Sequence, residues 1–186
     1  REGAYYGGGI GITLGLRDSH TEDINLRHGI DITLDATFRP QILSNLQSDI
    51  WQINALFCYY QPLWQNGLLI MDIFMEHNSE ETPWMLRAEL GDNYRMRGYY
   101  PGQYNGNTLI TTQLELRQLI YQSLAIAVWG GGGTAFSSQD KLSLSKILPN
   151  YGAGIRWYLN SDSAICFDVG FGRDCYNFIL GLNQAF

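Results

Sequence analysis

Residues 29–38 read GIDITLDATF, and apolar and polar side chains alternate along this stretch without a break. Because successive side chains of a β-strand point to opposite faces of a sheet, the alternation predicts a strand with one apolar and one polar face. The apolar set is Ile30, Ile32, Leu34, Ala36 and Phe38, and the polar set is Asp31, Thr33, Asp35 and Thr37. This pattern indicates an all-β chain.

The same alternation recurs along the chain. It is clear in LITTQLELRQ (109–118), NYGAGIRWYL (150–159), AICFDVGFG (164–172) and NFILGLNQAF (177–186), and weaker at 8–17, 50–60, 67–76 and 123–133. Together these segments predict about nine strands of roughly ten residues, the length at which a tilted strand crosses a bilayer. We interpret residues 1–186 as a single domain.

The predicted connections differ in length. We expect short turns at 160–163 and 173–176, and long excursions at 17–28, 39–49, 78–107 and 136–149. Long loops at one end and short turns at the other are typical of an outer-membrane barrel.

The polar face separates a membrane barrel from a soluble one. Its predicted charged members are Arg17, Asp31, Asp35, Asp72, Glu76, Glu115, Arg117, Arg156 and Asp168, and the chain's two Lys, Lys141 and Lys146, lie elsewhere. The exterior of a soluble barrel is normally rich in Lys and Glu, whereas a confined lumen favours small residues and charges that pair. An interfacial aromatic girdle is predicted from Trp51, Tyr59, Tyr60, Trp129, Trp157 and Tyr158. We therefore predict an antiparallel transmembrane β-barrel of about 8–10 strands, embedded in lipid of a bacterial-type outer membrane.

Composition argues against several other classes. The net charge is -6, with no cluster of Lys and Arg, so we expect no nucleic-acid partner. Three Cys without metal-ligand spacing indicate neither a disulfide framework nor a zinc site. Gly130–Gly133 lack the Lys-Ser/Thr of a phosphate-binding loop, and no GxSxG motif is present, so we predict neither a cofactor nor an enzyme. Glu76, Glu80 and Glu81 are compatible with a divalent cation, although a solvated acidic loop is the favoured interpretation.

The stretch MRGYYPGQYNGNTLITTQLELR (96–117) resembles the signature of the outer-membrane assembly factor superfamily, which includes BamA, two-partner secretion transporters and bacterial surface antigen barrels. Arg97, Gly98 and Tyr99 match the tip of the family's long loop, and Glu115 and Arg117 match a Glu-x-Arg element on the next strand. The last three strands also resemble the family's, and Phe186 matches its C-terminal strand signal. The resemblance covers residues 95–186 firmly and the rest loosely.

This resemblance implies that loop 78–107 folds back into the barrel lumen and presents Arg97 to a carboxylate of the wall. A guanidinium held by carboxylates makes strong charge-assisted hydrogen bonds that Lys does not reproduce. The family usually places an Asp on the following strand, but AVWGGGGTAF (127–136) has Gly130 or Gly131 there. Glu115 or Asp168 is therefore the predicted partner of Arg97.

The resemblance also implies a function, namely the insertion or translocation of proteins at the outer membrane, with unfolded outer-membrane proteins or other substrate proteins as partners. A passive pore, or a membrane anchor for a passenger domain, is the alternative, and a soluble ligand-binding barrel is a third. The family's barrel is usually larger, and even strand counts are the rule in bacterial single-chain barrels, so we expect eight or ten strands here. In a barrel of this size the loop stays near the mouth, or two or more chains share a larger assembly as a homo-oligomer.

Overall fold

The computed structural model describes residues 6–23, 26–137, 146–160 and 163–182, and the all-β prediction is confirmed. In the described residues the main sheet comprises β1 (Ile10–Asp23), β2 (Leu26–Arg39), β3 (Ile50–Trp64), β4 (Gly67–Asn78), β7 (Thr108–Tyr121), β8 (Leu124–Phe136), β9 (Leu148–Tyr158), β10 (Ala164–Phe171) and β11 (Tyr176–Leu182). A short 3-10 turn, η1 (Gln41–Leu43), lies between β2 and β3.

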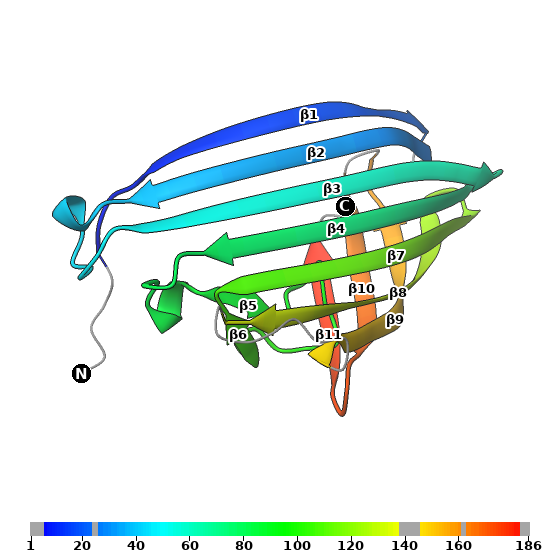
Figure 1. Cartoon of the computed structure of the whole chain (residues 1–186). Coiled ribbons are helices and arrows are strands. Elements are labelled where there is room, and N and C mark those ends of the chain that lie inside the picture. Colours follow the sequence, from blue (N-terminus) through cyan, green and yellow to red (C-terminus); the bar gives the residue numbers. More distant parts are fainter. Residues whose placement is uncertain (1–5, 24–25, 138–145, 161–162, 183–186) are drawn as a thin grey trace.

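The strands of the main sheet pair antiparallel in chain order. β4 pairs directly with β7, and the segment between them in the chain lies outside the main sheet. The pairing keeps like faces together: Leu14 lies opposite Leu34 in the β1–β2 pair, and Arg17 lies opposite Asp31. The sheet curves strongly, and the segment between β4 and β7 lies on its concave side (Figure 1).

In the described part of the chain this sheet is open. β1 and β11 are its two end strands, and no pairing between them closes it into a barrel. The nine strands fall within the predicted range of 8–10, but the number is odd rather than even. The antiparallel sheet is thus established, whereas closure is not part of the structure described.

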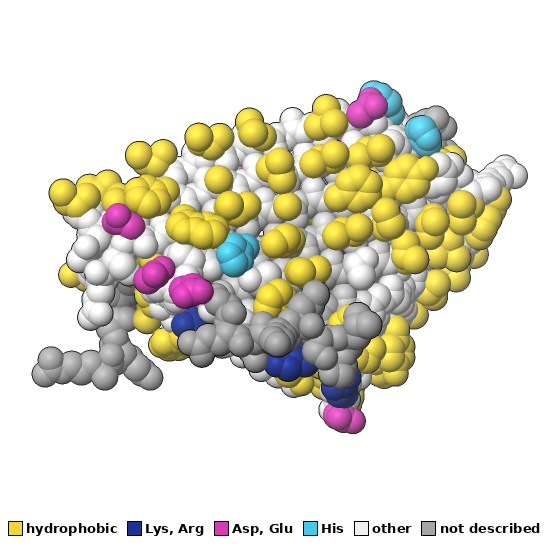
Figure 2. Space-filling view, in the orientation of Figure 1, with side chains coloured by type: hydrophobic (Ala, Val, Ile, Leu, Met, Phe, Trp, Pro, Cys, Tyr) yellow, Lys and Arg dark blue, Asp and Glu magenta, His cyan; other side chains and the backbone are white. Residues whose placement is uncertain are grey.

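The predicted sorting of side chains is confirmed. Figure 2 shows apolar side chains over most of the convex face in view. Around the whole convex surface the exposed apolar residues include Leu14, Ile53, Val128, Ile155 and Phe167, with exposed fractions of 46–65%. The concave face carries buried polar residues, including Asp31, Asp72, Glu115, Arg156 and Asp168. Such a surface is the reverse of a soluble protein, which buries its apolar face.

One predicted connection is wrong, and a second is confirmed as a short turn but lies at the other end of the sheet than expected. Residues 17–28 are not a long excursion: β1 and β2 pair from Ile10–Phe38 to Asp23–Leu26, so these residues continue the hairpin. The polar residues there suggested a loop, but they are accommodated as strand residues by cross-strand partners. The short turn near 173–176 joins β10 to β11, and the alternating strand directions put it at the same end as the long loops.

The predicted aromatic girdle is also corrected. Trp129, Tyr60 and Tyr158 are 3–5% exposed and lie on the concave face, because alternation places them there with the polar residues. Trp51 and Trp157, at 40% and 59% exposed, do lie on the convex surface.

The described residues include no helix long and apolar enough to cross a membrane. Cys58, Cys166 and Cys175 are free thiols.

Candidate functional site

The segment between β4 and β7 is folded rather than a solvated loop. It contains a 3-10 turn, η2 (Trp84–Leu86), and two short strands, β5 (Ala88–Leu90) and β6 (Tyr104–Gly106), that pair with each other. Its apolar side chains form a cluster with the main sheet: Ala88, Leu90, Met96, Tyr99, Leu109 and Leu148. We call residues 79–107 the inserted loop.

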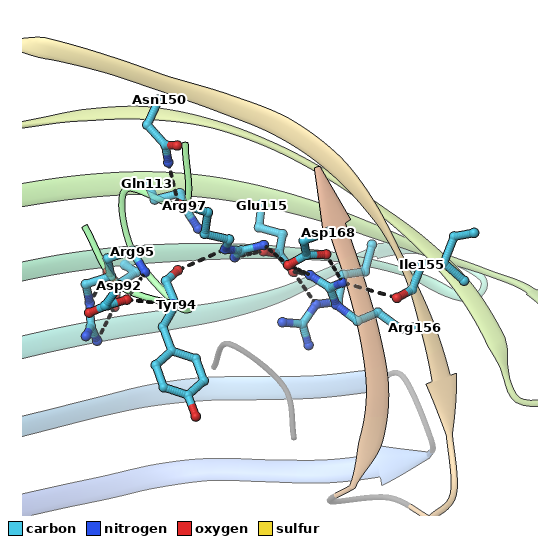
Figure 3. Close-up of polar contacts among 12 residues, drawn as sticks. Asp92, Tyr94, Arg95, Arg97, Gln113, Glu115, Asn150, Ile155, Arg156 and Asp168 are labelled. Carbon is cyan, nitrogen blue, oxygen red and sulfur yellow. Dashed lines mark hydrogen bonds and ion pairs between the residues drawn. The ribbon is translucent and has the colours of Figure 1, made fainter. Parts of the chain in front are cut away.

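Local sequence shapes the tip of the inserted loop. Gly91 has a φ of 101°, which favours glycine. The Asp92 carboxylate accepts hydrogen bonds from the backbone N–H groups of Tyr94 (2.6 Å) and Arg95 (2.5 Å), as in an Asx turn. This turn directs Arg95 and Arg97 toward the sheet (Figure 3).

Arg97 is completely buried, and both carboxylates predicted as its partners contact it. Its Nη2 donates to Glu115 of β7, and its Nη1 donates to Asp168 of β10 over 3.0 Å. Its Nε donates to the backbone carbonyl of Tyr94 within the loop over 2.9 Å, which fixes the plane of the guanidinium. One side chain thus joins the loop to two strands that are far apart in sequence.

Trp129 of β8 supplies a further contact. The Arg97 guanidinium carbon lies 4.0 Å from the centroid of the Trp129 ring, within the range of a cation–π interaction. β8, which carries Gly130–Gly133, therefore holds Arg97 through the aromatic face of Trp129.

The two carboxylates each bind a second arginine. Glu115 accepts from Arg117 Nε over 2.6 Å, and Arg156 pairs with Asp168 through both terminal nitrogens. Arg156 also lies 3.6 Å from Glu115, so three guanidinium groups and two carboxylates form one buried network. Each buried charge in such a network is stabilised by its partners, and removal of one partner typically lowers the stability of a protein by about 3–5 kcal/mol.

Gly98 and Tyr99 are held by β9 and by the β10–β11 turn. The Gly98 N–H donates to Asn150 (3.2 Å), which in turn donates to Gln113 (3.0 Å). The Tyr99 hydroxyl donates to the Pro149 carbonyl and accepts from the Arg173 N–H, both over 2.7 Å. Burial raises the pKa of Tyr99, while the Arg173 hydrogen bond acts in the opposite direction, so the hydroxyl stays protonated at neutral pH.

Glycines in the wall make room for these groups. A Cβ on Gly170 would lie 2.7 Å from the Arg97 carbonyl carbon. A Cβ on Gly154 would overlap the Asp168 carboxylate, and one on Gly152 would overlap the Trp129 ring. The loop and its partners therefore fit only against a wall without side chains at these points.

A second ion pair lies beside the first network. Arg95 donates to both oxygens of Asp72 on β4, over 2.8 and 3.1 Å, and its guanidinium carbon lies 4.6 Å from the Phe74 ring. The inserted loop is thus anchored to β4 as well as to β7 and β10.

The sequence-predicted residues Arg97, Gly98, Tyr99, Glu115, Arg117 and Asp168 lie together, whereas Phe186 lies outside the described residues. Arg95, Trp129, Asn150 and the wall glycines were not predicted as site residues. The alternation through Ala125 and Ala127 puts Trp129 on the concave face, so that signal was present in the sequence.

Among the described residues, no group of three or more His, Cys, Asp or Glu side chains could hold a metal ion. Glu76 instead accepts hydrogen bonds from Gln52 and Asn78. The arginines and carboxylates of the network bind one another, an arrangement that suits anchoring.

The chain matches no protein-family model, and no curated protein is significantly similar to it.

Proposed function

We propose that this protein is a β-barrel component of a bacterial-type outer membrane, of the assembly-factor class, that promotes insertion or translocation of other proteins. The observation that carries this proposal is the inserted loop, held on the concave side of the sheet by the buried side chain of Arg97 between Glu115 and Asp168. The Arg-Gly-Tyr tip and the Glu-x-Arg strand, which carry the resemblance to that class, meet at this one point.

The convex surface supports a membrane location. Apolar side chains cover it from β1, where Ile12 is 65% exposed, to β11, where Leu180 is 76% exposed. Contiguous apolar surface of this extent is unfavourable in water and favourable in hydrocarbon, while the main-chain groups inside the sheet are paired between strands.

The inserted loop favours the assembly class over a passive pore. A pore requires an open aqueous path, whereas this loop packs its own apolar cluster and two ion-pair systems into the concave side. Its many specific contacts are expected for a loop whose position matters to the activity.

Reconstitution in liposomes tests the proposal. A denatured outer-membrane protein of eight strands is added to liposomes with and without the chain, and its folding is followed by heat-dependent gel mobility. Dye release from the same liposomes measures pore formation. We expect faster client folding with the chain, and loss of this acceleration in Arg97→Ala.

Arg173→Ala is the matched control, because the exposed Arg173 side chain donates to the Ile147 carbonyl outside the network, and the substitution keeps the backbone N–H that bonds Tyr99. Each variant is first shown to fold by its own gel mobility. Client folding that is no faster with the wild-type chain would overturn the proposal, and dye release without acceleration would favour the passive pore.

A further inference from the structure

A groove crosses the convex surface of β1, β2 and β3 near the end of the sheet that carries the inserted loop. Its volume is about 380 Å³, which lies within the range of about 300–1,000 Å³ that is typical of ligand sites. Its apolar lining residues are Ile10, Ile12, Ala36, Phe38, Trp51 and Ile53. The groove is therefore a hollowed part of the apolar surface.

The register of the three strands explains the groove. Ala36 of β2 lies between Ile12 of β1 and Ile53 of β3 in one cross-strand row. In the next row toward the loop end, Phe38 lies opposite Trp51. A methyl side chain between two longer ones leaves a depression, and the two aromatic side chains form its wall at the loop end. These three strands thus build a slot where the alternation alone would give an even apolar layer.

A polar hollow adjoins the groove at Trp51, which lines both. The hollow has a volume of about 480 Å³, and its lining includes His77 and residues 78–81. The Trp51 and His77 rings lie 5.1 Å apart. Glu80 and Glu81 are exposed there, and the described residues that line the hollow include no Lys or Arg. The hollow is therefore acidic, next to an apolar slot.

Position and charge identify an occupant for the groove and the hollow. The groove is continuous with the convex surface, which the proposed function places in lipid, so an acyl chain is the apolar group that meets it. Trp51 is the second residue of β3, and Trp at a strand end is typical of the membrane–water interface. At that interface, Glu80 and Glu81 would repel a purely anionic head group, whereas an ammonium group would donate charge-assisted hydrogen bonds to them.

We propose that the groove and the hollow together bind one phospholipid with a primary-ammonium head group. Its acyl chain lies over Ala36, and its ammonium group contacts Glu80 and Glu81. A lipid held at both points exchanges more slowly than the lipids on the rest of the convex surface. This inference rests on the membrane location proposed above and does not depend on the protein-assembly activity.

Photolabelling in vesicles tests this lipid site. The probes are phosphatidylethanolamine and phosphatidylglycerol that carry the same diazirine-bearing acyl chain, each added as a minor component to phosphatidylglycerol vesicles that contain the folded chain. Mass spectrometry of the labelled peptides locates the sites. We expect the ethanolamine probe to label residues 10–12, 36–38 and 51–53 about two- to fivefold more than the glycerol probe, the ratio expected for an exposed ion pair.

Two sets of variants separate the acyl chain from the head group. Ala36→Leu fills the groove and should remove most of its labelling by both probes, whereas Ala153→Leu, at an exposed alanine of β9, should leave that labelling unchanged. Glu80→Gln combined with Glu81→Gln should abolish the preference for the ethanolamine probe. Glu89→Gln, at an exposed carboxylate of β5 outside the hollow, should keep it. Each variant is first shown to fold by its own gel mobility.

Three results would overturn the proposal. These are equal labelling of the groove by the two probes in the wild type, stronger labelling by the glycerol probe, which would make an anionic lipid the occupant, and groove labelling that Ala36→Leu does not reduce. Absence of label from the whole convex surface would overturn the membrane location as well. Client folding in liposomes is measured separately, so failure of the lipid site and failure of the protein-assembly activity are distinguishable.

Discussion

The strands under the inserted loop and the strands at the β1 end of the sheet carry the same alternation, but their concave-face side chains differ in burial. On β7, the concave-face residues Gln113, Glu115 and Arg117 are 0–3% exposed, whereas on β1 the Arg17 side chain is 79% exposed. The difference is the inserted loop, which contacts β4 through Arg95 and β7, β8 and β10 through Arg97. Alternation therefore determines on which face of the sheet a side chain lies, and the inserted loop determines whether the side chains on the concave face are buried.

The largest difference in the free energy of unfolding is expected when one carboxylate is removed under the inserted loop and one at the β1 end of the sheet. Glu115→Gln leaves Arg97, Arg117 and Arg156 without their shared anion, and should lower the free energy of unfolding by about 3–5 kcal/mol. Asp35→Asn on β2 likewise replaces a carboxylate by an amide. Because Asp35 accepts a hydrogen bond from Thr13 in an exposed position, this change should lower the free energy of unfolding by less than about 1 kcal/mol. Urea unfolding in lipid vesicles, followed by Trp fluorescence, measures both. Equal losses of unfolding free energy in the two variants would contradict the contrast between the strands under the inserted loop and the β1 end of the sheet.

Arg97→Lys tests whether the geometry of the guanidinium matters beyond its charge. An ammonium group cannot span Glu115 and Asp168 as the planar guanidinium does, nor stack as well on Trp129, so we expect a loss of about 2–3 kcal/mol. Hydrogen exchange should rise in residues 92–100 and remain unchanged in β2 and β3. Unchanged exchange at the loop tip would show that a positive charge alone is sufficient.

Two glycine substitutions should affect the free energy of unfolding differently. Gly170→Ala places a methyl group 2.7 Å from the Arg97 carbonyl carbon and should destabilise the protein by about 1–3 kcal/mol. Gly15→Ala on β1 meets open space and should be neutral or stabilising, by up to about 1 kcal/mol. The same unfolding measurement compares them. A tolerated Gly170→Ala would mean that the loop does not rest against β10.

The smallest effect is expected from Tyr99→Phe. This change removes the hydroxyl that bonds Pro149 and Arg173, at a cost of about 1–2 kcal/mol. Tyr100→Phe is the matched control, because that hydroxyl makes one exposed hydrogen bond of 3.3 Å and should cost less than about 0.5 kcal/mol. Thermal unfolding of the two variants should therefore separate them, with the lower Tm for Tyr99→Phe.

The strands and their faces could be predicted because alternation is local: residues 29–38 contain all that is needed to place Asp31 inside and Ile32 outside. The contact of Arg97 with Glu115 and Asp168 could be proposed from the resemblance and from the polarity of the wall. The support from Trp129 and Gly154 could not, because it depends on how the curved sheet brings β8, β9 and β10 around one guanidinium. Residues 17–28 were misjudged because polar strand residues and loop residues look alike without their partners.

The most direct test of the anchored loop is a double-mutant cycle between Arg97→Ala and Glu115→Gln, measured by urea unfolding in lipid vesicles. Direct contact in a buried network predicts a coupling free energy of about 1.5–3 kcal/mol, so that the double variant is less destabilised than the sum of the two single variants. A coupling near zero would contradict the account, because it would mean that Arg97 and Glu115 do not meet and that the inserted loop is held in some other way.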